Sequence, residues 1–211
     1  MKNGELRVSE HHIDGNHTND DPKNRMKIPQ SIHFVAHQVA RHAQPFELPS
    51  VFFIGKAGTG KTTWANKLVD AHGYSRLSFA SEVKRIAKDE FGMVTKDRKL
   101  LQIIGRTGRA LDKFLWVKYL TRKLQGHVVI DDCRFLNEFL VLKLLGFTSV
   151  FLKCPDDVRI PRLTSQGGLN DISETELEQL EYYSDFVFDT SESKDLIYSA
   201  IALVLEEESD D

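Results

Sequence analysis

The chain is poor in cysteine, in long apolar runs and in excess positive charge. Only Cys133 and Cys154 occur among the 211 residues, too few and too far apart for a disulfide framework or a zinc site. We therefore expect a reducing, cytoplasmic compartment. No apolar run approaches the ~20 residues that span a bilayer, and the N-terminal stretch MKNGELRVSEHH lacks the apolar core of a secretory signal. We expect neither a membrane partner nor export by that route.

Charge and length narrow the function classes further. The formal net charge is −3, so the chain lacks the basic surface that binding to a nucleic-acid backbone requires, and we expect no nucleic-acid partner. An apolar content of 41% over 211 residues suffices for one core but not for two large domains. We predict one compact α/β domain with a terminal extension. The sequence does not decide the oligomeric state and leaves a homodimer open.

The first 46 residues form a polar N-terminal extension. The first 27 are rich in Asn, Asp, His, Lys and Gly and hold almost no large apolar side chains, so burial cannot offset the entropy of ordering them. We expect this part to be disordered. Apolar residues at near-helical spacing predict one short amphipathic helix over 28–43. Pro45 and Pro49 then interrupt the chain just before the first strand of the second part, residues 47–211.

Histidine is concentrated in the extension. Six of the eight histidines fall there: His11, His12, His17, His33, His37 and His42. Such a cluster suggests a metal-binding tract, but its irregular spacing favours the simpler interpretation of a solvated polar tail.

A glycine-rich motif follows the first apolar run. Residues 51–54 read VFFI and lead into GKAGTGKT at 55–62, a complete G-x-x-x-x-G-K-T phosphate loop between a predicted strand and a predicted helix. The glycines let backbone N–H groups converge on a triphosphate. Lys61 is expected to reach the outer phosphates, and the Thr62 hydroxyl to hold Mg²⁺. We predict that ATP is bound by Gly55, Ala57, Gly58, Thr59, Gly60, Lys61, Thr62 and Thr63.

Strand and helix patterns alternate from residue 50 onward. Strands are predicted at 50–54, 76–79, 127–131, 148–153 and 185–188. Helices are predicted at 61–71, 81–91, 96–105, 109–125, 135–145, 156–165, 173–182 and 192–207. This alternation predicts a five-stranded parallel sheet between two helical layers, the three-layer P-loop NTPase fold.

Two carboxylates end the third predicted strand. Ligands of an open parallel sheet gather at the carboxyl ends of its strands, so Asp131 or Asp132 should face the ion held by Thr62. Side chains alternate along a strand, so only one of the two shares that direction, and the other caps a helix or meets an acceptor. Alternatively, both only cap the helix at 135–145. We take Asp131 as the first candidate metal ligand, although the sequence does not choose between the two aspartates.

Three further segments carry patterned polar and aromatic residues. They read FASEVKRIA at 79–87, LLQIIGRTGR at 100–109 followed by Asp112 and Trp116, and DDCRFLNE at 131–138. Together with the phosphate loop they resemble, in order, the motifs of the deoxynucleoside monophosphate kinases of phages and bacteria. The resemblance runs through residues 51–154. It implies a nucleoside monophosphate kinase-like fold, transfer of the γ-phosphoryl group of ATP to a deoxynucleoside monophosphate, and a cytoplasmic site of action, including host cytoplasm.

The resemblance also implies a set of acceptor-binding residues: Ser81, Lys84, Arg85, Arg109, Asp112, Trp116, Asp132, Arg134, Asn137 and Glu138. Arg109 and Arg134 are expected to grip the acceptor phosphate, since a guanidinium fork matches its oxygens. Lys61 and Arg134 are also expected to act catalytically. Trp116 either stacks on the base or packs in the core, and Lys84 and Arg85 either contact the acceptor or face solvent.

The resemblance also implies a mobile, arginine-bearing lid, which we expect after residue 155. Arg159 and Arg162 lie three apart on a predicted helix, and SQGG at 165–168 offers a hinge, so we expect both arginines to close over the phosphates and act catalytically. The match to the family is poorer here, because only residues 169–172 separate this hinge from a capping-box sequence at 173–176. Two alternatives remain open: a P-loop kinase for another small phosphate acceptor, such as dephospho-coenzyme A, and a nucleotide-binding regulatory protein without turnover.

Overall fold

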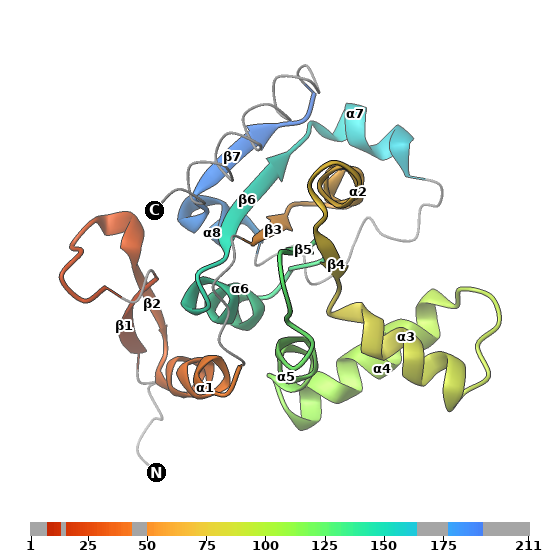
Figure 1. The fold of residues 1–211 in the computed structure, drawn as a ribbon, viewed down its shortest axis with the longest axis horizontal. Helices are drawn as coiled ribbons and strands as arrows, with labels where there is room; N and C mark the ends of the chain where they lie inside the picture. The colour runs from red at the N-terminus through yellow and green to blue at the C-terminus, as the bar shows by residue number, and fades with distance from the viewer. Residues whose placement is uncertain (1–7, 14–15, 44–49, 164–176, 192–211) are drawn as a thin grey trace, which may run out of the picture.

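A single parallel sheet forms the centre of the protein. The computed structural model describes residues 8–13, 16–43, 50–163 and 177–191 (Figure 1). Five strands pair in the order β4-β5-β3-β6-β7, and all four pairings are parallel. Their bounds are β3 Val51–Ile54, β4 Ser75–Leu77, β5 Val128–Ile130, β6 Thr148–Lys153 and β7 Phe186–Asp189. The predicted five-stranded parallel sheet is confirmed.

Helices cover both faces of this sheet. On one face, α2 (Lys61–His72) packs Trp64 and Leu68 against the inward residues of β3, β5 and β6. On the other face lie α6 (Leu136–Leu144) and α8 (Leu177–Tyr183), and the ring of Phe139 meets that of Phe52 at 5.6 Å between centroids. Every residue of β3 is buried, as expected of a strand covered on both faces. The predicted three-layer P-loop fold is confirmed.

Three helices pack against one another, and the first two of them project beyond the β4 edge of the sheet (Figure 1). They are α3 (Ala80–Asp89), α4 (Arg98–Leu111) and α5 (Leu115–Thr121), and they share a small core that includes Val83, Ile104 and Trp116. The predicted break between helices at 105–109 does not occur. Instead α4 runs through Gly108, where a Cβ atom would lie only 2.2 Å from Cζ2 of Trp116. The glycine permits close packing and does not end the helix.

The structure corrects the expectation of disorder over the first 27 residues. Within the described part of this segment, β1 (Val8–His12) pairs antiparallel with β2 (Arg25–Pro29). A short 3₁₀ helix, η1 (Pro22–Asn24), directly precedes β2. Three apolar side chains of this segment, Ile13, Met26 and Ile28, are buried in the main core, whereas Val8 at the start of β1 is exposed. The low average apolar content led to a wrong prediction of disorder, because the few buried apolar residues of this hairpin pack against the rest of the chain.

Helix α1 (Gln30–Arg41) lies within the predicted helix of residues 28–43 and packs against α6 (Figure 1). Helix α7 (Asp156–Arg159) is shorter than predicted and passes into η2 (Ile160–Arg162), since Pro161 has no N–H to continue an α-helical ladder. The predicted hinge at 165–168, the capping box at 173–176 and the helix at 192–207 lie outside the described residues. None of the helices in the described ranges combines the length and the apolar character needed to cross a bilayer.

Candidate active site

The loop between β3 and α2 has the backbone that its glycines predict. Gly55, Gly58 and Gly60 have φ angles of 140°, 85° and 91°, a region that only glycine enters without strain. Gly58 also lies against α7, where an added Cβ atom would be 2.6 Å from the carbonyl oxygen of Arg159. A glycine at position 58 therefore serves both the turn of the loop and its contact with α7.

Two basic side chains bind the backbone of this loop. Nζ of Lys61 donates to the carbonyl oxygens of Gly55 at 2.6 Å and Lys56 at 2.8 Å. Arg159 is buried, and its NH1 donates to the carbonyl oxygen of Ala57 at 3.0 Å while its Nε pairs with Asp156 at 2.7 Å. Arg159 thus holds the loop in place from α7.

Arg162 points to a different partner from Arg159. In η2, its guanidinium lies 3.4 Å from the carbonyl oxygen of Thr190 and 3.5 Å from Sγ of Cys154. The two predicted lid arginines therefore contact different parts of the protein, the phosphate loop and the end of β7, because the chain leaves the α-helical path at Ile160.

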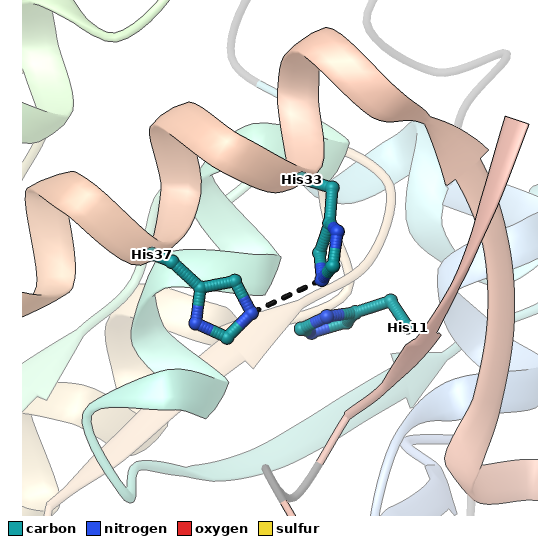
Figure 2. Close-up of side chains that lie close together, drawn as sticks. All are labelled: His11, His33 and His37. Atoms are coloured by element: carbon teal, nitrogen blue, oxygen red, sulfur yellow. Dashed lines mark hydrogen bonds between the residues drawn. The ribbon is translucent and has the colours of Figure 1, made fainter. Parts of the chain in front are cut away.

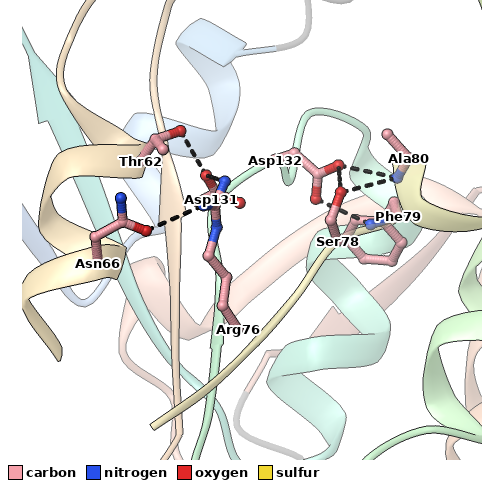
Figure 3. A network of polar contacts seen from close by, with 8 residues as sticks. All are labelled: Thr62, Asn66, Arg76, Ser78, Phe79, Ala80, Asp131 and Asp132. Carbon is pink, nitrogen blue, oxygen red and sulfur yellow. Dashed lines mark hydrogen bonds and ion pairs between the residues drawn. The ribbon is translucent and has the colours of Figure 1, made fainter. Parts of the chain in front are cut away.

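Adjacent aspartates at the end of β5 point to opposite sides (Figure 3). Oδ2 of Asp131 accepts the hydroxyl of Thr62 at 2.6 Å, so Asp131 is the aspartate that faces the phosphate loop. Asp132 instead accepts the hydroxyl of Ser78 at 2.6 Å and the N–H groups of Phe79 and Ala80 at 3.0 Å. Asp132 therefore caps α3. The alternative in which both aspartates cap the helix after residue 135 is not observed in these contacts.

Arg76 was not predicted to belong to the site. Its NH2 pairs with Oδ2 of Asp131 at 2.6 Å, and its NH1 donates to Asn66 of α2 at 3.0 Å (Figure 3). The side chain of Asp131 is only 4% exposed, so Arg76 compensates a nearly buried carboxylate. The one sequence signal for this role is a basic residue in the middle of a short strand, β4.

A cavity of about 220 Å³ lies on the other side of the β5 end, between α3, α4 and the start of α6. Six predicted acceptor residues line it: Lys84, Arg109, Trp116, Asp132, Arg134 and Glu138. Eight further lining residues were not predicted: Phe79, Ala80, Val83, Leu101, Gln102, Gly105, Arg106 and Phe135. All eight fall within or beside the patterned segments 79–87, 100–109 and 131–138, so the segments were informative although the individual residues were not singled out.

The other four predicted acceptor residues lie outside this cavity. Arg85 pairs along α3 with the buried carboxylate of Glu82 at 2.7 Å and with Asp89 at 3.1 Å, and Ser81 on the same helix is exposed. Asp112 accepts the N–H of Phe114 at 2.8 Å and pairs with Lys118 at 2.7 Å. Asn137 donates to the carbonyl oxygen of Lys113 at 2.6 Å. In this structure Asp112 and Asn137 stabilise the turn between α4 and α5.

The cavity is strongly basic. Lys84, Arg106, Arg109 and Arg134 line it against two carboxyl groups. One of these, Glu138, is 3% exposed and accepts the N–H groups of Arg134 at 2.9 Å and Phe135 at 3.2 Å. Burial, reinforced by Asp132, raises the pKa of Glu138 to about 8, so this carboxyl is largely uncharged at neutral pH.

Aromatic rings form the apolar walls. The guanidinium of Arg109 lies 4.4 Å from the ring centroid of Phe135, a cation–π contact that aligns the two. Trp116 is 3% exposed and donates from Nε1 to the carbonyl oxygen of Gly105 at 3.0 Å. Trp116 belongs to the core, as one interpretation predicted, and also lines the cavity; stacking on a base stays a prediction.

Solved structures with a similar fold include two shikimate kinases and a gluconokinase. The shikimate kinase of Aquifex aeolicus is 19% identical in sequence; the match covers 76% of this chain and 98% of that kinase, with a TM-score of 0.49. The shikimate kinase of Acinetobacter baumannii, in complex with shikimate, is 18% identical, covering 76% and 94%, with a TM-score of 0.48. The gluconokinase of Sinorhizobium meliloti is 19% identical, covering 77% and 96%, with a TM-score of 0.42.

No curated protein matches the chain. The sequence model of one family, described as an AAA domain, matches residues 51–183, which is more than half of the chain and includes the phosphate loop, β5 and the segments that line the cavity. The chain therefore belongs to the AAA domain family.

Proposed function

We propose that the protein is a Mg²⁺-dependent kinase that transfers the γ-phosphoryl group of ATP to a deoxynucleoside monophosphate. One observation carries the proposal: the adjacent residues Asp131 and Asp132 connect the phosphate loop on one side to the basic cavity on the other. Phosphoryl transfer requires a donor and an acceptor held close together and in line, with positive charge around the transferring group. Two neighbouring sites that share one strand end support the first part of this requirement, the closeness of donor and acceptor.

The donor side fits ATP with Mg²⁺. The Thr62 hydroxyl and the Asp131 carboxylate, 2.6 Å apart, are the hard oxygen ligands that Mg²⁺ prefers. Mg²⁺ held there would neutralise charge on the phosphates. The glycine-rich backbone would cradle these phosphates, and Lys61, which here lies over the loop, would turn from the loop carbonyls to them. Arg159 acts as a positioning residue by fixing the loop at Ala57.

The acceptor side suits a nucleoside monophosphate. Arg109 and Arg134 offer guanidinium groups to a phosphate, and Arg134 is the candidate to stabilise the transferring group as well. Because Glu138 is largely neutral, it opposes a dianionic phosphate less than an ionised carboxylate would. Phe79, Trp116 and Phe135 offer the apolar surfaces on which a base can pack. The choice of a deoxynucleotide rests on the resemblance of the segments at 79–87, 100–109 and 131–138.

The test is a coupled ADP-release assay with ATP and Mg²⁺. The acceptor panel contains the four deoxynucleoside monophosphates, 5-substituted pyrimidine variants, the ribonucleotides and dephospho-coenzyme A. We expect ADP release that depends on one or more deoxynucleoside monophosphates. Release with dephospho-coenzyme A alone would indicate a kinase for a different acceptor. Release that ignores every acceptor, or no release, would indicate a nucleotide-binding regulatory protein.

A further inference from the structure

Three histidines from two elements of the N-terminal extension meet at one point (Figure 2). His11 comes from β1, and His33 and His37 come from α1. One ring nitrogen from each lies within 4.8 Å of the other two, and the Nε2 atoms of His33 and His37 are 3.1 Å apart. The ring centroids are separated by 4.8 to 5.3 Å, with the rings edge-on to one another.

Local structure explains why residues so far apart in sequence converge. His33 and His37 are four residues apart on a helix and therefore lie on the same face. Strand β2 leads directly into α1, and His11 stands opposite Met26 in the β1–β2 ladder. The hairpin is anchored by the buried side chains of Met26 and Ile28, and this places His11 against the histidine face of α1.

The cluster leaves a buried polar atom unsatisfied. His11 is only 1% exposed, and its Nε2 has no hydrogen-bond partner within the described ranges. An unsatisfied buried group of this kind destabilises the fold. His33 and His37 can share one hydrogen bond between them, but that bond does nothing for His11. A ligand that accepts lone pairs from all three rings would remove this destabilisation.

We propose that His11, His33 and His37 form a binding site for a divalent transition metal of the Zn²⁺ class, which ties the β1–β2 hairpin to α1. Imidazole nitrogen is a preferred ligand of Zn²⁺. Zn–N bonds of about 2.0–2.1 Å in a tetrahedral arrangement place the ligand nitrogens roughly 3.3 Å apart. At 3.1 Å, the Nε2 atoms of His33 and His37 are close to this separation, and a ring nitrogen of His11 lies within 4.8 Å of a ring nitrogen of each.

The protonation state of the rings agrees with this geometry. Burial, followed by the neighbouring imidazoles, lowers the pKa of His11 to about 4, and burial is also the main cause that lowers the pKa values of His33 and His37. The rings are therefore neutral at neutral pH, which is the form that binds a metal. Three protein ligands leave a fourth position for water or another donor.

This site is separate from the donor and acceptor sites. None of the three histidines lines the basic cavity; α1 packs on α5 and α6, and β1 packs on β2 and α1. The ion would therefore stabilise the folded extension, since metal bound only by the folded state adds its binding free energy to folding.

The test uses the full-length chain produced without a polyhistidine tag and stripped of metal. Zn²⁺ is titrated calorimetrically in the presence of excess Mg²⁺, which occupies oxygen-ligand sites, and Co²⁺ is added separately to read the ligand geometry from its visible absorption. We expect one equivalent of tightly bound Zn²⁺. His33→Ala and His37→Ala should each weaken binding on the order of 100-fold or more. His42→Ala, which removes an exposed histidine at the end of α1, should bind as the wild type does.

A stability measurement accompanies the titration. Zn²⁺ should raise the Tm of the wild type but not that of the His33→Ala/His37→Ala double variant, whose circular dichroism and ATP binding should match those of the metal-free wild type. The proposal is overturned if the wild type binds Zn²⁺ no more tightly than the double variant, or if His42→Ala loses binding as severely as His37→Ala.

Discussion

Arg76 and Asp131 form a 2.6 Å ion pair between neighbouring strands, and the same carboxylate oxygen accepts the hydroxyl of Thr62. The guanidinium therefore compensates a nearly buried carboxylate at the place where the proposed kinase would hold Mg²⁺. A Mg²⁺ ion bound there would share with Arg76, or take over from it, the compensation of the Asp131 charge. We therefore expect the pair to link the stability of the sheet edge to metal binding.

Arg76→Ala tests this link. Without Arg76 the carboxylate of Asp131 keeps only the Thr62 hydroxyl among its described partners, so we expect a loss of about 1–3 kcal/mol in the free energy of unfolding. Mg²⁺ with a nucleotide should recover part of the loss, as measured by urea denaturation with and without both. Arg85→Ala removes a partner of another largely buried carboxylate, Glu82, away from the phosphate loop, and serves as the control: Mg²⁺ and nucleotide should recover none of its stability loss. A loss that Mg²⁺ and nucleotide leave untouched would separate Arg76 from the metal site.

Arg134→Ala tests the acceptor side. If Arg134 holds the acceptor phosphate, its removal should raise the KM for the monophosphate about 10- to 100-fold, the equivalent of one charge-assisted hydrogen bond, and change the KM for ATP little. Steady-state kinetics with each substrate varied in turn measures both. Arg85→Ala should change neither, since Arg85 lies outside the cavity. Equal increases for both substrates would assign Arg134 a general structural role.

Glu138 predicts a pH dependence of stability. Its pKa is raised from 4.5 to about 8 in the folded protein, so between these values the unfolded chain loses a proton that the folded protein retains. The contribution of Glu138 to stability is therefore greatest below pH 4.5 and falls as pH rises toward 8, by at most about 1.4 kcal/mol per pH unit.

Glu138→Gln isolates that contribution, since its amide oxygen can still accept the N–H groups of Arg134 and Phe135. We expect its stability relative to the wild type to improve steadily from pH 5 to pH 8 in urea denaturation, over the window set by the raised pKa. Parallel pH profiles for the two proteins would show that Glu138 is ionised in the fold.

Gly108 and Gly105 provide a matched pair on α4. Alanine at either position gains up to about 1 kcal/mol of helix propensity. At position 108, however, the new Cβ would lie 2.2 Å from Trp116, whereas at position 105 its nearest neighbour is the Arg109 side chain at 3.6 Å. Gly108→Ala should therefore cost about 1–3 kcal/mol and lower the Tm, while Gly105→Ala should not. Similar Tm values for the two variants would contradict the close packing of Trp116.

Features that depend on local sequence patterns were predicted correctly. The phosphate loop was predicted from its motif, and the sheet from apolar runs of strand length. Alternation along β5 correctly indicated that Asp131 and Asp132 diverge, but the choice between them depends on the twist and pairing of β5 with β3 and β4. Local patterns do not encode that information.

The remaining features depend on contacts between distant segments. Arg76 becomes informative only once β4 lies beside β5, and the β1–β2 hairpin is ordered by burial against helices that come later in the chain. The same holds for Asp112 and Asn137, which share a motif with cavity residues but bond to the turn after α4. A motif specified the segment, and tertiary packing decided which of its side chains face the cavity.

The most direct measurement of the central claim follows the phosphoryl group itself. ATP labelled with ³²P at the γ position is mixed with excess enzyme, Mg²⁺ and a deoxynucleoside monophosphate, and the products of a single turnover are separated by chromatography. The proposed function predicts that label appears in the deoxynucleoside diphosphate, and that Lys61→Ala abolishes this transfer without unfolding the protein. Label that remains in ATP, or that appears only as inorganic phosphate, would contradict it.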